Sequence, residues 1–185
     1  MDLRRTLLLF SFIFTGSLAI AQPKDRWTIQ DGGAIRWSIN DNIPHDDHLE
    51  MSGQQLSVVL RYGVDAQKRF HLNRSLVFPM LRMHPNKTQN NLKQRFDVNI
   101  PALVTVDDQT LLNEEVRDVT FNGIMRVESS FGYIYRRKEL KDAVQLTRVL
   151  YPSTNAAHYC EEYTFKNSSP NQITLRVPEW NVIYT

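Results

Sequence analysis

The chain has 185 residues, of which 42% are hydrophobic, and its 22 basic and 20 acidic side chains give a formal net charge of +2. Charges of both signs are mixed along the chain, so the sequence offers no basic surface of the kind that attracts nucleic acids or anionic membranes. Cys160 is the single cysteine, which excludes an internal disulfide, and a domain of this length must then rely on its hydrophobic core.

Residues 1–21 have the zones of a cleavable export signal. Arg4 and Arg5 give a positive start, and the apolar run from Leu7 to Ile20 follows them. This run is shorter than the about 20 residues that a bilayer-spanning helix needs. We therefore expect a signal peptide rather than a membrane anchor.

The cleavage site is expected between Ala21 and Gln22, because Ala19 and Ala21 place small residues where a signal peptidase requires them. Removal of the signal takes away two arginines and one aspartate, which leaves 20 basic and 19 acidic residues. The expected mature protein is one domain over residues 22–185 that is periplasmic or secreted and has no membrane segment.

Beyond residue 25, apolar and polar side chains alternate with a period of two, which is typical of half-buried β-strands. In chain order, the apolar faces of the clearest runs are Leu56, Val58, Leu60, Tyr62 and Val64; Phe70, Leu72, Leu76 and Phe78; Val119 and Phe121; Met125 and Val127; Val144, Leu146 and Leu150; and Tyr159, Tyr163 and Phe165. The turn sequences between such runs include Asp31-Gly32-Gly33, Asp65-Ala66-Gln67-Lys68 and Asn122-Gly123.

Strands at such short spacing predict an all-β fold, an antiparallel β-sandwich, in a single domain. At most one short helix is expected. The best position for it is the start of the segment Lys138–Val149, which would then continue as a strand.

The densest polar cluster is the segment His45-Asp46-Asp47-His48-Leu49-Glu50. On a strand, Asp46, His48 and Glu50 would share one face. Histidine and carboxylate are metal-ligand types, but their spacing matches no standard metal motif, so no metal and no other cofactor is expected. Two interpretations stay open: a solvated loop that leads into a strand, and a ligand-binding segment formed by His45, Asp46, Asp47, His48 and Glu50.

Tryptophans are the second kind of candidate, because an exposed aromatic ring can stack on the apolar face of a sugar. Trp27, Trp37 and Trp180 are available, and Trp37 is included among the candidate ligand-binding residues. The alternative for each is packing inside the sheets.

Arg74 and Arg82 interrupt apolar patterns along their strand. A buried arginine requires a paired carboxylate, and Asp47 or Glu50 is a candidate partner. We expect these arginines to form internal ion pairs that fix the packing.

Enzyme motifs are absent from the sequence, which has no nucleophile elbow, phosphate-binding loop or zinc-protease helix. Glycoside hydrolysis needs two carboxylates across a bound sugar, and no local motif singles out such a pair. No catalytic residue is therefore assigned. A small metal-assisted lyase or hydrolase that uses His45, Asp47, His48 and Glu50 stays open as an alternative.

An ordered series of short motifs carries a family resemblance. The series consists of Ile43–Gly53, Val58–Asp65, Leu72–Arg74, Phe78–Arg82 and Pro85–Thr88. Together these motifs resemble the N-terminal β-sandwich domain of secreted bacterial six-hairpin glycosidases, of the kind encoded in polysaccharide-degrading Bacteroidota. The resemblance runs over nearly the whole expected mature chain.

The resemblance implies a supersandwich-like domain that precedes an (α/α)6 barrel, and the barrel carries the catalytic carboxylates. The sequence stops at Thr185, before a helical repeat begins. The expected function is thus a non-catalytic accessory domain of a secreted glycoside hydrolase in polysaccharide degradation, present as a fragment or a stand-alone module. Its expected partners are such a barrel, as a domain or a separate chain, and carbohydrate; the segment His45–Glu50 would line the mouth of the active site.

Two alternatives to this function remain. One is a carbohydrate-binding module that acts alone. The other is a structural domain that docks onto an exported partner.

Overall fold

The computed structural model describes residues 26–39, 44–82 and 91–179, without the side chains of residues 79–82 and 91–94. The expected signal segment, the motif at 85–88 and Trp180 lie outside the described residues. Within the described ranges, no helix is long and apolar enough to cross a membrane.

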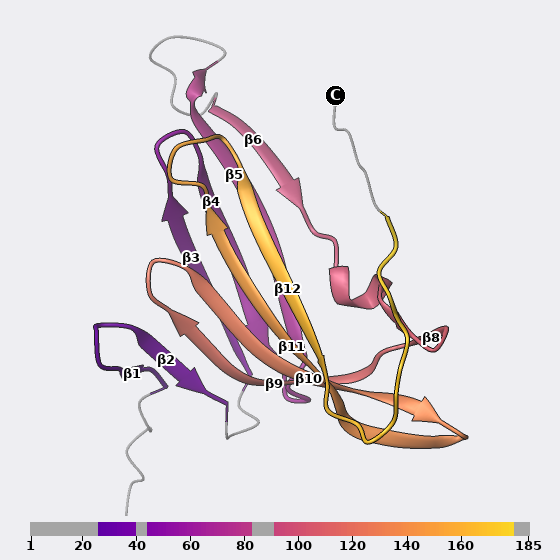
Figure 1. Cartoon of the computed structure of the whole chain (residues 1–185). Coiled ribbons are helices and arrows are strands. Elements are labelled where there is room, and N and C mark those ends of the chain that lie inside the picture. Colours follow the sequence, from indigo (N-terminus) through magenta and orange to yellow (C-terminus); the bar gives the residue numbers. More distant parts are fainter. Residues whose placement is uncertain (1–25, 40–43, 83–90, 180–185) are drawn as a thin grey trace, which may run out of the picture.

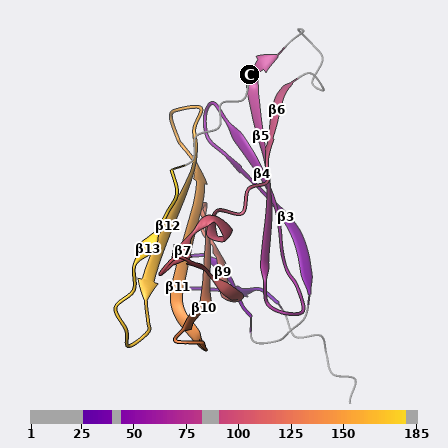
Figure 2. The same cartoon turned by 90° about the vertical axis from the view of Figure 1, so that its right-hand side faces the viewer.

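Two antiparallel sheets form the two layers of the molecule (Figures 1 and 2). The larger, six-stranded sheet has the order β1 (Thr28–Ile29), β2 (Ile35–Ser38), β9 (Leu112–Phe121), β10 (Met125–Tyr135), β11 (Lys138–Pro152) and β12 (Tyr159–Asn167). The four-stranded sheet has the order β3 (His45–Ser52), β4 (Ser57–Val64), β5 (Phe70–Arg82) and β6 (Asn91–Phe96). A small third sheet contains β13 (Leu175–Arg176), β7 (Thr105–Val106) and β8 (Gln109–Thr110).

The predicted all-β antiparallel sandwich is confirmed, and the described residues contain one short 3-10 helix, Ile100–Leu103. The position predicted for a short helix was wrong. Residues 138–149 lie entirely in β11, which is paired on one side with β10 and on the other with β12. Residues 138–140 pair with β10, and from Val144 onward the strand pairs with both β10 and β12. This pairing supplies backbone hydrogen bonds that a helix would otherwise make internally.

Three predicted turns join neighbouring strands. Gly32 and Gly33, between β1 and β2, have φ of +85° and +82°, and Gly123, between β9 and β10, has φ of +74°. Side chains other than glycine rarely adopt this left-handed region, which explains the glycines in these turns. In the β4–β5 turn, an Asp65 carboxylate oxygen accepts the backbone N–H groups of Gln67 and Arg69, each at 2.9 Å.

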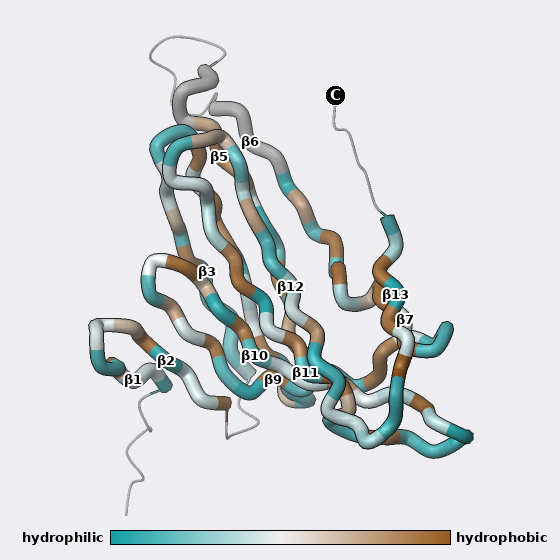
Figure 3. Tube along the Cα trace, in the orientation of Figure 1, coloured by the Kyte–Doolittle hydropathy of each residue, from teal (hydrophilic) through white to brown (hydrophobic). Residues whose placement is uncertain are grey.

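The main core lies between the two sheets and follows the period-two pattern of the sequence. The hydropathy of the chain alternates along the strands (Figure 3). The buried members of this core are Trp37, Ile39, Met51, Val58, Leu60, Tyr62, Val64, Phe70, Val116, Val119, Met125, Val127 and Leu150. A second buried cluster, in which the small third sheet takes part, contains Val106, Phe131, Tyr133, Ala143, Val144 and Leu146.

At one end of the sandwich, the β3–β4 turn meets the β11–β12 turn. Gly53 donates its backbone N–H to the carbonyl of Leu56 at 2.8 Å, and Gln54 donates its backbone N–H to the carbonyl of Thr154 at 3.3 Å. A Cβ added at Gly53 would lie 2.0 Å from the carbonyl oxygen of Ser153. The two sheets can therefore approach this closely only with glycine at this position.

We predict that Gly53→Ala lowers the free energy of unfolding by about 3 kcal/mol, the upper end of the range for overpacking, because the obstructing atom belongs to backbone. Gly63→Ala is the matched control. Its Cβ would meet Asp46 Oδ1 at 2.3 Å and His71 Nε2 at 2.4 Å, which are ends of exposed side chains that can move. Gly63→Ala should lower the free energy of unfolding by less than about 1 kcal/mol. Urea unfolding followed by tryptophan fluorescence measures both, and equal losses would contradict the prediction.

Candidate functional site

The polar segment singled out in the sequence forms β3, an edge strand of the four-stranded sheet. Its register with β4 pairs Asp46 with Gly63, His48 with Arg61, and Glu50 with Val59. As the period of two predicts, Asp46, His48 and Glu50 share the outer face of this sheet. All three are exposed.

A polar hollow of about 470 Å³ lies on this outer face. His71 Nε2 lies 2.6 Å from Asp46 Oδ1, and the pair passes over Gly63, whose missing side chain leaves the space for it. His48, Arg61 and Asn73 also line the hollow. These side chains are exposed, so the hollow is a solvated surface rather than an enclosed site.

Asp47 also lines the hollow, whereas His45 and Trp37 do not. His45 Nε2 lies 3.4 Å from Asp47 Oδ2, and the ring of His45 meets the ring of Trp37 edge-on at a centroid distance of 4.9 Å. Trp37 is 6% exposed, with the Trp27 ring 6.0 Å away and the Arg26 guanidinium 5.4 Å from its centroid. Trp37 is therefore a core side chain, and the prediction that its ring binds a ligand is corrected: packing leaves it no free face for a sugar.

The described residues contain no group of three or more histidine, cysteine, aspartate and glutamate side chains that is placed to hold a metal ion. The segment His45–Glu50 alternates between the two faces of the sheet, which separates its potential ligands.

The interior of the sandwich contains an ion pair that joins the two sheets. Arg74 on β5 is 2% exposed and binds both carboxylate oxygens of Glu161 on β12: Nε contacts Oε1, and Nη2 donates to Oε2 at 2.9 Å. Tyr163 donates its hydroxyl to Glu161 Oε2 at 2.6 Å. Arg74 Nη1 donates to the carbonyl of Val98 at 3.0 Å, so this guanidinium also fixes the chain after β6.

The partner of Arg74 differs from the candidates named from the sequence. Asp47 and Glu50 are exposed on β3, and β4 separates that strand from β5. Glu161 faces Arg74 from the opposite sheet instead. The side chain of Arg82, the second predicted member of an ion pair, lies outside the described residues.

A second buried arginine, Arg148 on β11, lies beside the first pair. Its Nη1 is 2.6 Å from Oε1 of Glu114 on β9, so the two groups form an ion pair, although their angle does not make a hydrogen bond. The same Nη1 donates a hydrogen bond to Ser129 Oγ at 3.1 Å. The exposed fractions of Arg148 and Glu114 are 3% and 9%. The Arg148 guanidinium also lies 5.2 Å from the ring centroid of Phe70 on the facing sheet. Two arginines thus occupy positions that the strand pattern reserves for apolar side chains.

Burial and charge shift the pKa values around this network. Burial raises the pKa of Tyr159 and Tyr163, and the nearby carboxylate of Glu161 adds to the shift. Burial alone would lower the pKa of Arg74, but its hydrogen bonds to Glu161 and the negative charge there outweigh it and raise that pKa. Burial likewise raises the pKa of Tyr62 to about 12, with a smaller contribution from Asp47.

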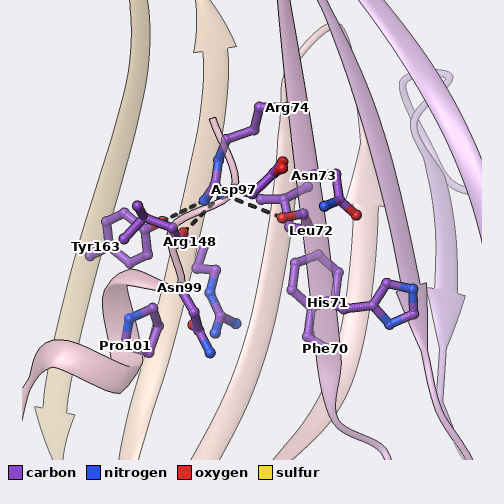
Figure 4. A pocket seen from close by; sticks show the side chains of 11 residues that line it. Phe70, His71, Leu72, Asn73, Arg74, Asp97, Asn99, Pro101, Arg148 and Tyr163 are labelled. Carbon is purple, nitrogen blue, oxygen red and sulfur yellow. Dashed lines mark hydrogen bonds between the residues drawn. The ribbon is translucent and has the colours of Figure 1, made fainter. Parts of the chain in front are cut away.

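A cavity of about 190 Å³ opens between the two arginines and the segment that follows β6 (Figure 4). Phe70, Leu72 and Arg74 reach it from β5, Arg148 from β11, and Tyr163 from β12. Asp97, Val98, Asn99 and Pro101 close its remaining side. His71 and Asn73 also line it, but their side chains point away from Arg148 in Figure 4.

The cavity and most of its polar side chains were not predicted from the sequence. One signal was available: Arg148 interrupts the apolar face of Val144, Leu146 and Leu150, as Arg74 interrupts its own strand. Glu161 likewise lies between Tyr159 and Tyr163 in the same alternation.

Comparison with known proteins gave no match to a family model, a curated protein or a solved structure. The resemblance to six-hairpin glycosidases therefore stays a prediction from the motifs. The physical evidence on function is the geometry of the described residues.

We predict that Arg74→Met lowers the free energy of unfolding by about 3–5 kcal/mol, because Glu161 would keep a buried charge without a partner. Glu161→Leu should cost a similar amount. The double variant Arg74→Met/Glu161→Leu should recover most of the loss, since well-packed apolar residues replace a buried ion pair at little cost. Urea unfolding of the three variants gives the coupling energy of the pair.

The control is the exposed Arg36–Asp118 pair, in which Arg36 is 44% exposed. Arg36→Met should lower the free energy of unfolding far less than Arg74→Met does, because water screens an exposed ion pair. Additive losses in the Arg74–Glu161 cycle would contradict an ion pair between the sheets.

The raised pKa of Tyr62 predicts a loss of stability in alkali. The unfolded chain ionises this hydroxyl near pH 10.0 and the folded chain near pH 12, so its contribution is complete below pH 10.0 and is lost as the pH rises through about 12. In Tyr62→Phe, the free energy of unfolding should decrease less steeply with pH over this range. Some decrease should remain, because the other buried tyrosines also ionise. Unfolding in urea at several alkaline pH values measures the slope, and an unchanged slope would refute the assignment.

Proposed function

We propose that this chain is a non-catalytic accessory β-sandwich domain of a secreted glycoside hydrolase that acts in polysaccharide degradation. The observation that carries the proposal is the position of the motifs. The described motif residues 44–53, 58–65, 72–74 and 78–82 fall almost entirely in β3, β4 and β5, which are consecutive neighbours in one sheet. The resemblance thus concerns one continuous structural unit rather than scattered short matches.

The charges inside the sandwich support an accessory role. Glu161 and Glu114 are the carboxylates buried between the strands of the described region, and each is held by an arginine. A glycosidase acid must be free to protonate a leaving group on a bound sugar. A carboxylate that is held inside the sandwich by an arginine is not free to reach a substrate, which suits a structural contact.

The proposal assigns the chemistry to an (α/α)6 barrel, in the same polypeptide or in a separate chain. The expected signal at residues 1–21 would deliver the sandwich to the periplasm or the medium. There the sandwich would support the barrel, and β3 with its exposed acidic residues would lie near the substrate.

The test begins with the DNA that adjoins the coding region, where the proposal expects an (α/α)6 barrel in frame or in the neighbouring gene. The barrel is then expressed with and without this chain. Binding to the folded barrel should raise its Tm, and the rise should increase with the logarithm of the concentration of the sandwich once that concentration exceeds the Kd. An unrelated β-sandwich at the same concentration is the control. A barrel whose Tm and hydrolysis of polysaccharide are the same with and without this chain would refute the accessory role.

A further inference from the structure

The cavity beside Arg148 is lined by part of a guanidinium whose contacts with the described residues use only one of its three nitrogens. Arg148 is 3% exposed, and within the described residues its hydrogen bond and ion pair both run through Nη1. The Nε and Nη2 edge of the guanidinium is left for the cavity. A guanidinium has five N–H donors, so the donors on this edge are available to a ligand oxygen that can accept hydrogen bonds from them.

The segment after β6 supplies further polar groups. Asn99 occupies the N-cap position of the 3-10 helix, yet its side chain makes no capping hydrogen bond. Figure 4 shows Asn99 and Arg148 extending into the same space. Asp97 is exposed at the mouth, and among the described residues neither its carboxylate nor the Asn99 amide has a hydrogen-bond partner.

The charge balance of the cavity selects the class of ligand. Arg74 and Arg148 are each neutralised by a glutamate, which leaves Asp97 as the uncompensated carboxylate among the lining side chains. This arrangement disfavours an anion. A neutral ligand rich in hydroxyl groups fits better, because each hydroxyl both donates and accepts: it can accept from Arg148 and Asn99 and donate to Asp97.

The size of the cavity limits the ligand further. Its volume of about 190 Å³ is below the roughly 300–1,000 Å³ of pockets for drug-sized molecules. Phe70, Leu72 and Pro101 give it an apolar wall that suits the C–H groups of a ring. One pyranose or furanose ring satisfies both the volume and the mixture of polar and apolar contacts.

We propose that this cavity binds a single neutral sugar ring, as an end or a branch of a polysaccharide. The sugar lies between β5, β11 and the 3-10 helix. Arg148 and Asn99 donate to its hydroxyl oxygens, and Asp97 accepts from a hydroxyl. The choice of sugar among hydroxyl-rich ligands rests on the proposed link to a glycoside hydrolase.

NMR titration of the chain tests the proposal with glucose, galactose, mannose and arabinose as neutral probes and with glucuronate and acetate as anionic probes. The expected result is a saturable shift of the Arg148 Nε–H and of the amides near Asn99 with at least one neutral sugar, at a Kd in the millimolar range. Shifts with the anions alone, or with none of the probes, would overturn the proposal.

Substitutions localise the binding. Asp97→Ala and Asn99→Ala each remove a hydrogen bond at the mouth of the cavity without touching the core, and each should weaken binding by about tenfold. Arg148→Lys keeps a cation beside Glu114 but removes the free guanidinium edge, so it should also weaken binding. Asn73→Ala is the matched control, since Asn73 is at the edge of the cavity but its side chain points away from Arg148, and it should bind like the unchanged chain.

Unchanged affinity in Asp97→Ala, Asn99→Ala and Arg148→Lys would place any sugar elsewhere and overturn the assignment. The outcome is separate from the accessory role. A chain that binds no sugar but still raises the Tm of the barrel refutes this site alone, whereas a chain that binds sugar without affecting the barrel refutes the accessory role alone.

Discussion

The contact on which the rest of the structure depends is the ion pair of Arg74 and Glu161 between the two sheets. Two charges buried in an apolar interior are costly unless their remaining hydrogen bonds are also satisfied. Here Tyr163 donates a hydrogen bond to Glu161, and the Val98 carbonyl accepts one from Arg74. Because the Val98 contact belongs to the chain after β6, the same guanidinium that joins the sheets also positions the wall of the cavity.

This arrangement connects structure to the proposed role. The buried carboxylates are held in ion pairs. Around the cavity lie the Nε and Nη2 edge of Arg148 and the side chains of Asp97 and Asn99, which have no hydrogen-bond partner among the described residues. In our proposal, the cavity beside Arg148 holds a sugar ring and the sandwich supports a partner barrel. In the proposed assembly, the bond-breaking carboxylates belong to the barrel.

Much of the fold could be predicted from the sequence, because strand period and turn chemistry are local properties. The four apolar residues predicted for the inner face of β4 and Leu56 just before it are all buried, and the glycine turns join the strands expected. The partner of Arg74 could not be found in this way, since Glu161 lies 87 residues away on the other sheet. The prediction that Trp37 exposes its ring to a ligand was wrong, because the exposure of this ring depends on how β2 and β3 pack. A local sequence pattern does not contain that information. The cavity was missed for the same reason: its wall consists of segments that only the folded chain brings together.

The most direct test of the central contact is the Nε–H resonance of Arg74 in nitrogen-detected NMR of the folded chain. An arginine held by a buried carboxylate should show a resolved Nε–H signal that exchanges slowly with water and moves on Glu161→Gln substitution. That result would establish the link between the sheets. A signal that exchanges as fast as that of an exposed arginine, and that is unaffected by the substitution, would contradict it.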